Sequence, residues 1–172
     1  MITTRQIYDN IEDVQEVWQF ANECYSKGYM NNASLKAMKF EWCIQQGGAW
    51  YATYDKDNII SISGIHPFKD GYRALFRGAQ LQPRSIGINK YHMQSYCFYD
   101  QLPLQIKFAN SNPVYITTNV ENDASGKMTR IDKTFHHLAK FGVVDHIAQE
   151  EIFYTLQNVW QLNVKRYNEV RF

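Results

Sequence analysis

The chain has few of the residues and runs that mark metal-binding, secreted or membrane proteins. Its 172 residues include only three cysteines, Cys24, Cys43 and Cys97. No two of them form a CxxC pair, so we expect neither a zinc site nor a redox motif. Three widely spaced cysteines are typical of reduced thiols packed in a core, which fits a cytoplasmic protein without a bound metal.

Long apolar runs and long runs of one charge are also missing. No window approaches the roughly 18–20 apolar residues of a membrane span. The first ten residues lack the basic region and apolar run of a signal peptide. The formal net charge is +1, with Lys and Arg scattered among Asp and Glu, whereas a nucleic-acid-binding protein usually carries a basic stripe. We therefore expect no membrane partner and no nucleic-acid partner.

Several common catalytic motifs are absent from the sequence. It contains no GxxxxGK[ST] phosphate loop, no HExxH zinc motif and no GxSxG nucleophile motif. Internal repeats and low-complexity segments are missing as well. Because domains typically run about 100–200 residues, we expect one domain spanning residues 1–172.

Apolar residues in steps of three and four indicate two helices in the first third of the chain. The first begins with capping-box spacing at Asp9 and ends near Gly28. The second begins between residues 32 and 34 and ends at Gly47, because glycine accepts the left-handed conformation of a helix end.

Two further helices alternate with short segments of high β-propensity. One helix begins near Asn89 and runs through Phe98, and Pro103 either kinks it or begins a second helical piece. The other spans residues 125–140 and ends at Gly142. The expected strands are residues 2–8, 49–55, 59–65, 72–81, 113–120, 151–156 and 159–167, the last two joined by a turn at Gln157-Asn158.

The order of these elements predicts an α/β (α+β) protein with a mixed sheet. The chain reads β-α-α-β-β-β-α-β-α-β-β, with three consecutive strands followed by a strand–helix–strand crossover. The crossover joins residues 72–81 to residues 113–120 and should be parallel and right-handed. We expect about seven strands flanked by helices.

The loop before the third helix has the composition of an anion site. It reads Arg84-Ser85-Ile86-Gly87-Ile88-Asn89. Free N–H groups at a helix N-terminus favour an anion, glycine allows close approach of the backbone, and arginine adds a charge-assisted contact. The loop could therefore hold a pyrophosphate, or it could be an ordinary strand-to-helix loop with one turn glycine.

The element order and this loop resemble those of the GNAT superfamily of acyl-CoA N-acyltransferases. The family's loop has Arg or Gln, two residues, Gly, one residue, then Gly or Ala. Arg84 and Gly87 match, whereas Asn89 departs and would narrow the space for the pyrophosphate. Asn122 before a helix and the closing segment 140–143, Lys-Phe-Gly-Val, are similar to the family's Asn and its Lys-x-Gly-Phe-like stop.

The resemblance implies a centrally splayed sheet that binds acetyl-CoA. In the family, the fourth and fifth strands part, and the pantetheine arm enters between them. Backbone groups at the end of the fourth strand would line the arm, and main-chain N–H groups of the loop would hold the pyrophosphate. The implied cofactor-binding residues are Ala79, Gln80, Leu81, Gln82, Arg84, Ser85, Ile86, Gly87, Ile88, Asn89 and Asn122.

The implied chemistry is direct attack of an amine on the thioester, which needs a base, an oxyanion donor and an acid for the thiolate. Members of the family often supply the acid from a Tyr just before the stop, but this stretch has none. His136 and His137 are substitutes, since histidine titrates near neutral pH, or they are one surface and one half-buried histidine. Asn122 could bind the arm or cap the helix, and Tyr115 and Tyr154 could take part in catalysis or pack in the core. The candidate catalytic residues are Asn122, His136, His137 and Tyr154.

Two classes of function remain open from the sequence. The first is an N-acetyltransferase acting on a primary amine of a small molecule or peptide. The alternative is a catalytically impaired acyl-CoA-binding or assembly protein. The assembly reading rests on the last two strands, whose exposed edges could pair in a homodimer through Phe153, Tyr154, Val159 and Trp160.

Overall fold

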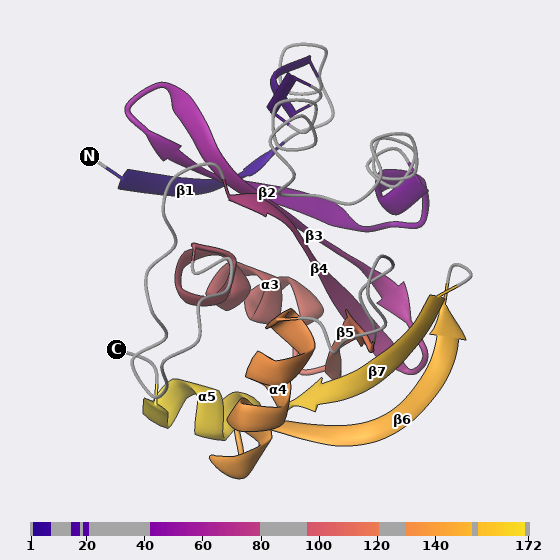
Figure 1. Cartoon of the computed structure of the whole chain (residues 1–172). Coiled ribbons are helices and arrows are strands. Elements are labelled where there is room, and N and C mark those ends of the chain that lie inside the picture. Colours follow the sequence, from indigo (N-terminus) through magenta and orange to yellow (C-terminus); the bar gives the residue numbers. More distant parts are fainter. Residues whose placement is uncertain are drawn as a thin grey trace.

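The computed structural model of the chain is built on one mixed sheet (Figure 1). The strands run in the order β1-β2-β3-β4-β5-β7-β6, and neighbours are antiparallel except β4 and β5, which are parallel. This confirms the mixed seven-stranded sheet and the parallel crossover. The strands are β1 (Ile2–Ile7), β2 (Ala49–Asp55), β3 (Asn58–Phe68), β4 (Gly71–Ala79), β5 (Val114–Asn119), β6 (Val144–Ile152) and β7 (Thr155–Leu162). The structure describes residues 2–7, 15–17, 19–20, 42–79, 96–120, 130–152 and 155–170.

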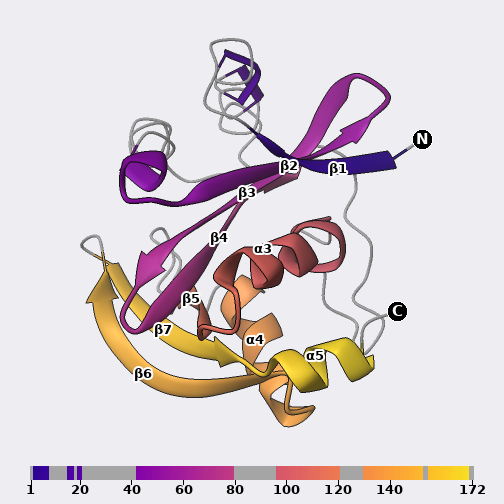
Figure 2. The same ribbon diagram turned by 180° about the vertical axis from the view of Figure 1, so that it is seen from behind.

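Helices cover both faces of the sheet. Short helical segments at residues 15–17, 19–20 and 42–45, which fall within the two helices predicted for the first third of the chain, lie on one face. The other face carries the π-helix η1 (Cys97–Gln101) and the helices α3 (Leu102–Ala109), α4 (Arg130–Lys140) and α5 (Val164–Val170) (Figures 1 and 2). In the described part of the chain, no helix is long and apolar enough to cross a membrane.

Alternation along the strands divides the core into two clusters, because successive strand residues point to opposite faces. Tyr51 belongs to the cluster under α3, α4 and α5, whereas its neighbour Trp50 belongs to the cluster under the N-terminal helical segments. Cys43 and Cys97 are buried, reduced thiols, one on each side. This confirms the expected state of these two cysteines, while Cys24 lies outside the described residues.

A buried polar seam joins η1 and α3 to the sheet. The Gln101 amide nitrogen donates to the Thr53 hydroxyl at 3.0 Å, and its amide oxygen accepts from the Ser63 hydroxyl. The Gln105 amide nitrogen donates to the Ser63 oxygen at 2.7 Å. Since these side chains are buried, their mutual hydrogen bonds fix the position of the helix on β2 and β3.

The helical segment before β5 runs without a break from η1 into α3, since Gln101 and Leu102 both have right-handed helical dihedrals. Pro103 lies in the first turn of α3, directly after η1, so of the two predicted alternatives it marks the start of the second helical piece. Proline is tolerated there because the first N–H groups of a helix have no intrahelical partner. Asn110, in the left-handed conformation with φ 49°, ends α3.

The predicted boundaries of the last two strands are wrong. The expected turn at Gln157-Asn158 lies inside β7, and β6 begins at Val144 rather than Glu151. The two amides look like turn residues in the sequence, but both are buried and hydrogen-bonded. Asn158 donates to Asp132 of α4 at 2.8 Å, and Gln157 donates to the Ile152 carbonyl at 3.0 Å.

The C-terminal end of the last predicted strand is a helix instead. The side-chain oxygen of Asn163 accepts the Arg166 N–H at 3.0 Å, which is an N-cap for α5. Tyr167 is fully buried, and its hydroxyl donates to the Phe98 carbonyl. Val159 and Trp160 also lie in the core, so they are not dimer contacts, and β6 is the strand at this edge of the sheet.

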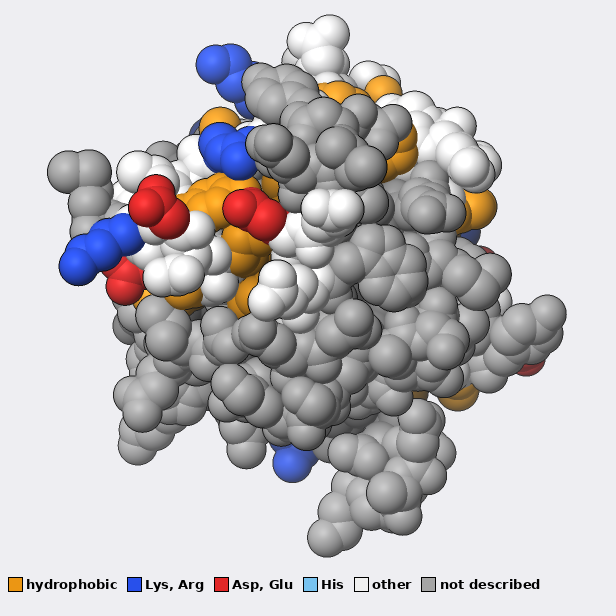
Figure 3. Space-filling view, turned by 90° about the horizontal axis from the view of Figure 1, so that it is seen from above, with side chains coloured by type: hydrophobic (Ala, Val, Ile, Leu, Met, Phe, Trp, Pro, Cys, Tyr) orange, Lys and Arg blue, Asp and Glu red, His pale blue; other side chains and the backbone are white. Residues whose placement is uncertain are grey.

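Charges of both signs share the surface. On the described part of the face seen from above, basic and acidic side chains lie next to one another (Figure 3). This mixture agrees with the scattered charges and the formal net charge of +1 in the sequence.

Candidate active site between β4 and β5

The pairing between β4 and β5 stops in the middle of the sheet. The ladder contains Tyr72↔Val114, Arg73↔Tyr115 and Ala74↔Ile116. Beyond it, β4 continues to Ala79 beside β3, and β5 continues to Asn119 beside β7 (Figures 1 and 2). We call this opening, between residues 75–79 and residues 117–119, the wedge. The expected splay of the two strands is therefore present.

The wedge leaves backbone groups outside the β4–β5 ladder. Buried backbone N–H and C=O groups need hydrogen-bond partners. An extended chain with its own amides, such as pantetheine, can supply such partners along a strand edge. Ala79, one of the expected arm-binding residues, is the last residue of β4 and pairs with Ser61 of β3. It therefore lies at the open end of the wedge.

One face of the wedge carries α4 and a buried carboxylate. Asp132 is fully buried, and one of its oxygens accepts from the Thr118 hydroxyl and from the Asn158 amide. Its other oxygen lies 3.2 Å from Nε2 of His136. The Trp160 indole N–H donates to the Thr118 oxygen at 2.8 Å. This network fixes α4 over the part of β5 that lies beyond the β4–β5 ladder.

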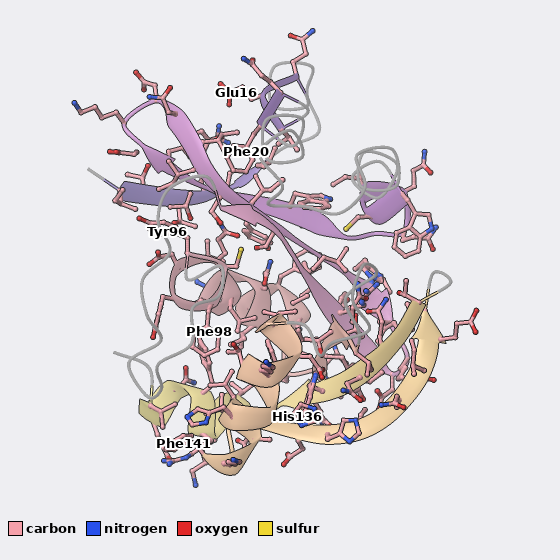
Figure 4. All side chains as sticks on the ribbon, in the orientation of Figure 1. Glu16, Phe20, Tyr96, Phe98, His136 and Phe141 are labelled. Carbon is pink, nitrogen blue, oxygen red and sulfur yellow. The ribbon has the colours of Figure 1, made fainter. Side chains whose placement is uncertain are left out.

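The two candidate histidines leave α4 on different sides. The His136 ring stands perpendicular to Trp160, with centroids 4.9 Å apart, and lies 6.5 Å from His146. Figure 4 shows it directed toward β6 and β7. The His137 ring lies 5.2 Å from Phe141 at the C-terminal end of the helix. The structure does not bring the two rings together, and their role as acids stays a prediction.

Apolar side chains occupy the sheet-facing side of α4 near these histidines. Phe135 and Leu138 are both fully buried in the cluster that also contains Ala74 and Ile116. This is the stretch in which the family often carries its tyrosine. Neither of these two apolar side chains can donate a proton as the family's tyrosine does.

The opposite face of the wedge contains a buried arginine that the sequence analysis missed. Arg73 is 2% exposed. Its Nε donates to the Thr117 hydroxyl at 2.8 Å, and its Nη2 lies 3.5 Å from the Gln157 amide oxygen. The guanidinium carbon is 5.8 Å from the centre of the Phe68 ring. The sequence feature that could have pointed to this residue is an arginine between two apolar residues of a central strand.

Tyr115 lies beside this arginine in the ladder and is buried. Its hydroxyl donates to the Asp70 carboxylate. This hydrogen bond raises the pKa of Tyr115, and burial and the negative charge of Asp70 act in the same direction. The phenol therefore stays protonated and holds the β3–β4 turn, which argues for the packing role among the two that were open.

The remaining predicted site residues lie outside the described part of the chain. Within that part, no group of three or more His, Cys, Asp or Glu side chains could hold a metal ion. The residues whose positions are not described are Gln80, Leu81, Gln82, Arg84, Ser85, Ile86, Gly87, Ile88, Asn89, Asn122 and Tyr154.

The same fold occurs in solved acetyltransferase structures. The sequence matches no protein-family model and no curated protein. Its fold is similar to that of a Desulfovibrio desulfuricans protein assigned to the GNAT family of acetyltransferases, with a TM-score of 0.63, 10% identity, and coverage of 95% of this chain and 99% of that one. The aminoglycoside 6'-N-acetyltransferase of Enterococcus faecium gives 0.61 at 12% identity, covering 92% and 94%. An aminoglycoside 6'-N-acetyltransferase in complex with coenzyme A gives 0.53 at 12% identity, covering 94% of both chains. These likenesses establish the fold expected from the sequence.

Proposed function

We propose, from the GNAT fold of the chain, that the protein is an N-acetyltransferase that transfers the acetyl group of acetyl-CoA to a primary amine of a small molecule or peptide. The wedge is the observation that carries this proposal. Two strands that part while each keeps its outer neighbour leave an opening for an extended arm. The coenzyme A complex of an enzyme with the same fold supports the choice of co-substrate.

The binding part of the proposal follows the chain beyond Ala79. Backbone groups of residues 79–82 would bind the pantetheine arm, and residues 84–89 would hold the pyrophosphate through main-chain N–H groups. Asn122 would bind the arm near the start of α4. We place this activity in a cytoplasmic protein whose residues 1–172 form one domain that needs no metal.

The chemical part is a direct transfer. The neutral amine attacks the thioester carbon, a C–N bond forms, and the carbonyl electrons move onto oxygen, where a backbone N–H of β4 would stabilise them. The C–S bond then breaks. The amine loses one proton to a base or water, and the coenzyme A thiolate gains one. His136, His137 and Tyr154 are the proposed proton carriers.

The proposal is tested by binding and turnover with the purified protein. Acetyl-CoA should raise the unfolding temperature, since a ligand that binds only the folded state stabilises it. A panel of amines, including an aminoglycoside, a polyamine, an amino acid and a peptide, should include one that releases free coenzyme A. Absence of both the thermal shift and any turnover would overturn the proposal.

A second candidate is an acyl-CoA-binding protein that has lost the chemistry. The apolar Phe135 and Leu138 favour it, because they occupy the stretch of α4 in which the family often has its acid. Binding of acetyl-CoA without thiol release from any amine would support this candidate. A burst of free thiol would exclude it.

A further inference from the structure

Arg73 is placed where the two halves of the sheet begin to separate. Its backbone pairs with Tyr115, one position before the ladder ends at Ala74↔Ile116. Its side chain is 2% exposed. A buried cation is costly unless it is well hydrogen-bonded, so this position in a central strand calls for a specific reason.

The arginine reaches forward into the wedge rather than straight across the ladder. Its Nε bonds Thr117, the first residue of β5 beyond the ladder, at 2.8 Å. Its Nη2 makes a longer contact, 3.5 Å, with Gln157, which pairs with Asn119 at the end of β5. One side chain of β4 therefore contacts both β5 and β7 along the open stretch.

The partners of Arg73 are themselves fixed. The Gln157 amide nitrogen donates to the Ile152 carbonyl and to the Thr155 hydroxyl, each at 3.0 Å, so it is tied to the β6–β7 hairpin. A guanidinium presents its donors in a rigid plane, whereas the lysine ammonium is a point charge on a flexible stem. Arginine can therefore hold two acceptors at a set separation.

We infer that Arg73 is a positioning residue that sets the separation of β4 and β5 in the wedge and thereby the affinity for acyl-CoA. This inference rests on the proposed function. Without the guanidinium, β4 loses the contacts that Arg73 makes with Thr117 and Gln157 beyond the ladder, and the wedge loses the spacing that an extended arm requires.

The decisive comparison is Arg73→Met with Arg5→Met in the full chain. Methionine keeps an unbranched apolar stem and removes the donors. Arg5 is a control for the contacts, because it also bonds a hydroxyl, that of Tyr54 at 3.0 Å, and lies 4.9 Å from an aromatic ring centre, but it is exposed and lies on β1 at the far edge. Calorimetry with coenzyme A should show affinity at least tenfold weaker for R73M and within twofold of wild type for R5M.

Two further readouts separate positioning from general damage. Amide exchange of residues 114–119 should be faster in R73M and unchanged in R5M. With an active amine, the KM for acetyl-CoA should rise in R73M while kcat and the KM for the amine change less than threefold. The coenzyme A affinity of Arg73→Lys should lie between those of wild type and R73M. Lysine can donate to one of the two acceptors but lacks the planar set of donors that reaches both.

If R73M does not fold, Thr117→Val decides the question. Valine has nearly the shape of threonine and removes only the acceptor of the Nε bond, so coenzyme A affinity should fall at least threefold. Unchanged affinity in folded R73M, or in T117V, would overturn the inference while wild-type binding leaves the proposed function intact. Failure of the wild type to bind coenzyme A would remove both.

Discussion

Asp132 is a fully buried carboxylate that serves three neighbours, Thr118, Asn158 and His136. Replacing it with alanine leaves their polar groups without this acceptor inside the protein. Leaving a buried donor without its acceptor typically costs about 1–3 kcal/mol, and Asp132 accepts from two buried donors, Thr118 and Asn158. We expect Asp132→Ala to lower the free energy of unfolding by at least about 2 kcal/mol, measured by urea denaturation followed by tryptophan fluorescence.

The control for this change is Lys133→Ala on the same helix. Lys133 is exposed, and surface substitutions usually change stability by about 0.5 kcal/mol or less. Equal losses in the two variants would show that the helix, and not the buried network, determines the effect.

The hydroxyl of Tyr115 gives a prediction with a defined pH dependence. The hydrogen bond to Asp70 raises the pKa of Tyr115 above its ordinary value of about 10, so the folded state favours the protonated phenol. The stabilisation is fully present below about pH 10 and is lost as the pH rises through the raised pKa. We expect Tyr115→Phe to cost about 1 kcal/mol at pH 8, and the difference from wild type to shrink at pH 11.

Denaturation at the two pH values measures this difference. Tyr72→Phe is the matched control, since that ring packs against Phe108 and its hydroxyl has no hydrogen bond in the described part of the structure. A Tyr115→Phe deficit that stays the same size at pH 11 would contradict the assignment.

Single residues show where sequence reasoning ends. The composition of segment 72–81 predicts a strand, and β4 (Gly71–Ala79) lies there. It does not reveal that Arg73 reaches Thr117 and Gln157, because those partners are 44 and 84 positions away. The same holds for Asn158, whose acceptor Asp132 lies on a helix. Gln157 and Asn158, which look like turn residues in the sequence, are therefore buried residues with hydrogen-bond partners far away in the chain.

At the scale of elements, local patterns predicted most of the sheet. Short aromatic and β-branched runs between turn residues gave β1 to β5 with small errors at their ends. The error at α5 has a physical cause. Val164, Tyr167 and Val170 favour a strand by propensity, whereas their spacing of three, the Asn163 cap and the burial of Tyr167 favour a helix. Tertiary packing therefore made this segment a helix and not a strand.

The junction of β4 and β5 can be tested at Gly71. A Cβ atom there would lie 2.1 Å from the Pro113 carbonyl oxygen, where Tyr72 N–H also bonds at 2.9 Å. Gly71→Ala must push the start of β5 away, and overpacking of this kind costs about 1–3 kcal/mol or more. Because the ladder has three pairs, we expect a loss of at least about 2 kcal/mol in denaturation, together with weaker coenzyme A binding.

Gly47→Ala separates crowding from backbone strain. Gly47 has φ +87°, and a Cβ atom added there would meet no other atom within 4 Å, so alanine suffers only the strain of a left-handed conformation, about 1 kcal/mol. It should leave coenzyme A binding unchanged. A smaller loss for Gly71→Ala than for Gly47→Ala would show that β5 can shift freely at this junction.

At the scale of the whole molecule, the wedge divides the sheet into two halves, β1–β4 and β5–β7. Among the described residues, the side-chain links between them on the face of Arg73 come from one short stretch of chain: Lys69 to Glu150 at 2.6 Å, Asp70 to Tyr115, and Arg73 to Thr117 and Gln157. On the other face, α3 and α4 share one core cluster with both halves. The strand ladder between the halves is therefore confined to one end of the sheet.

A ligand that fills the open end of the wedge should stabilise the whole fold. Acetyl-CoA at about 100 times its Kd adds about 2.7 kcal/mol to the stability, which corresponds to about 5–10 °C in Tm for a chain of this size. Gly87→Trp, in the loop proposed to hold the pyrophosphate, should leave the Tm without ligand unchanged, because only the approach of the phosphates is blocked. The same variant should lose the ligand-induced rise in Tm. A scanning-fluorimetry titration with acetyl-CoA measures both values, and a full rise in the variant would remove this loop from the binding site while leaving the wedge itself to be tested by Arg73.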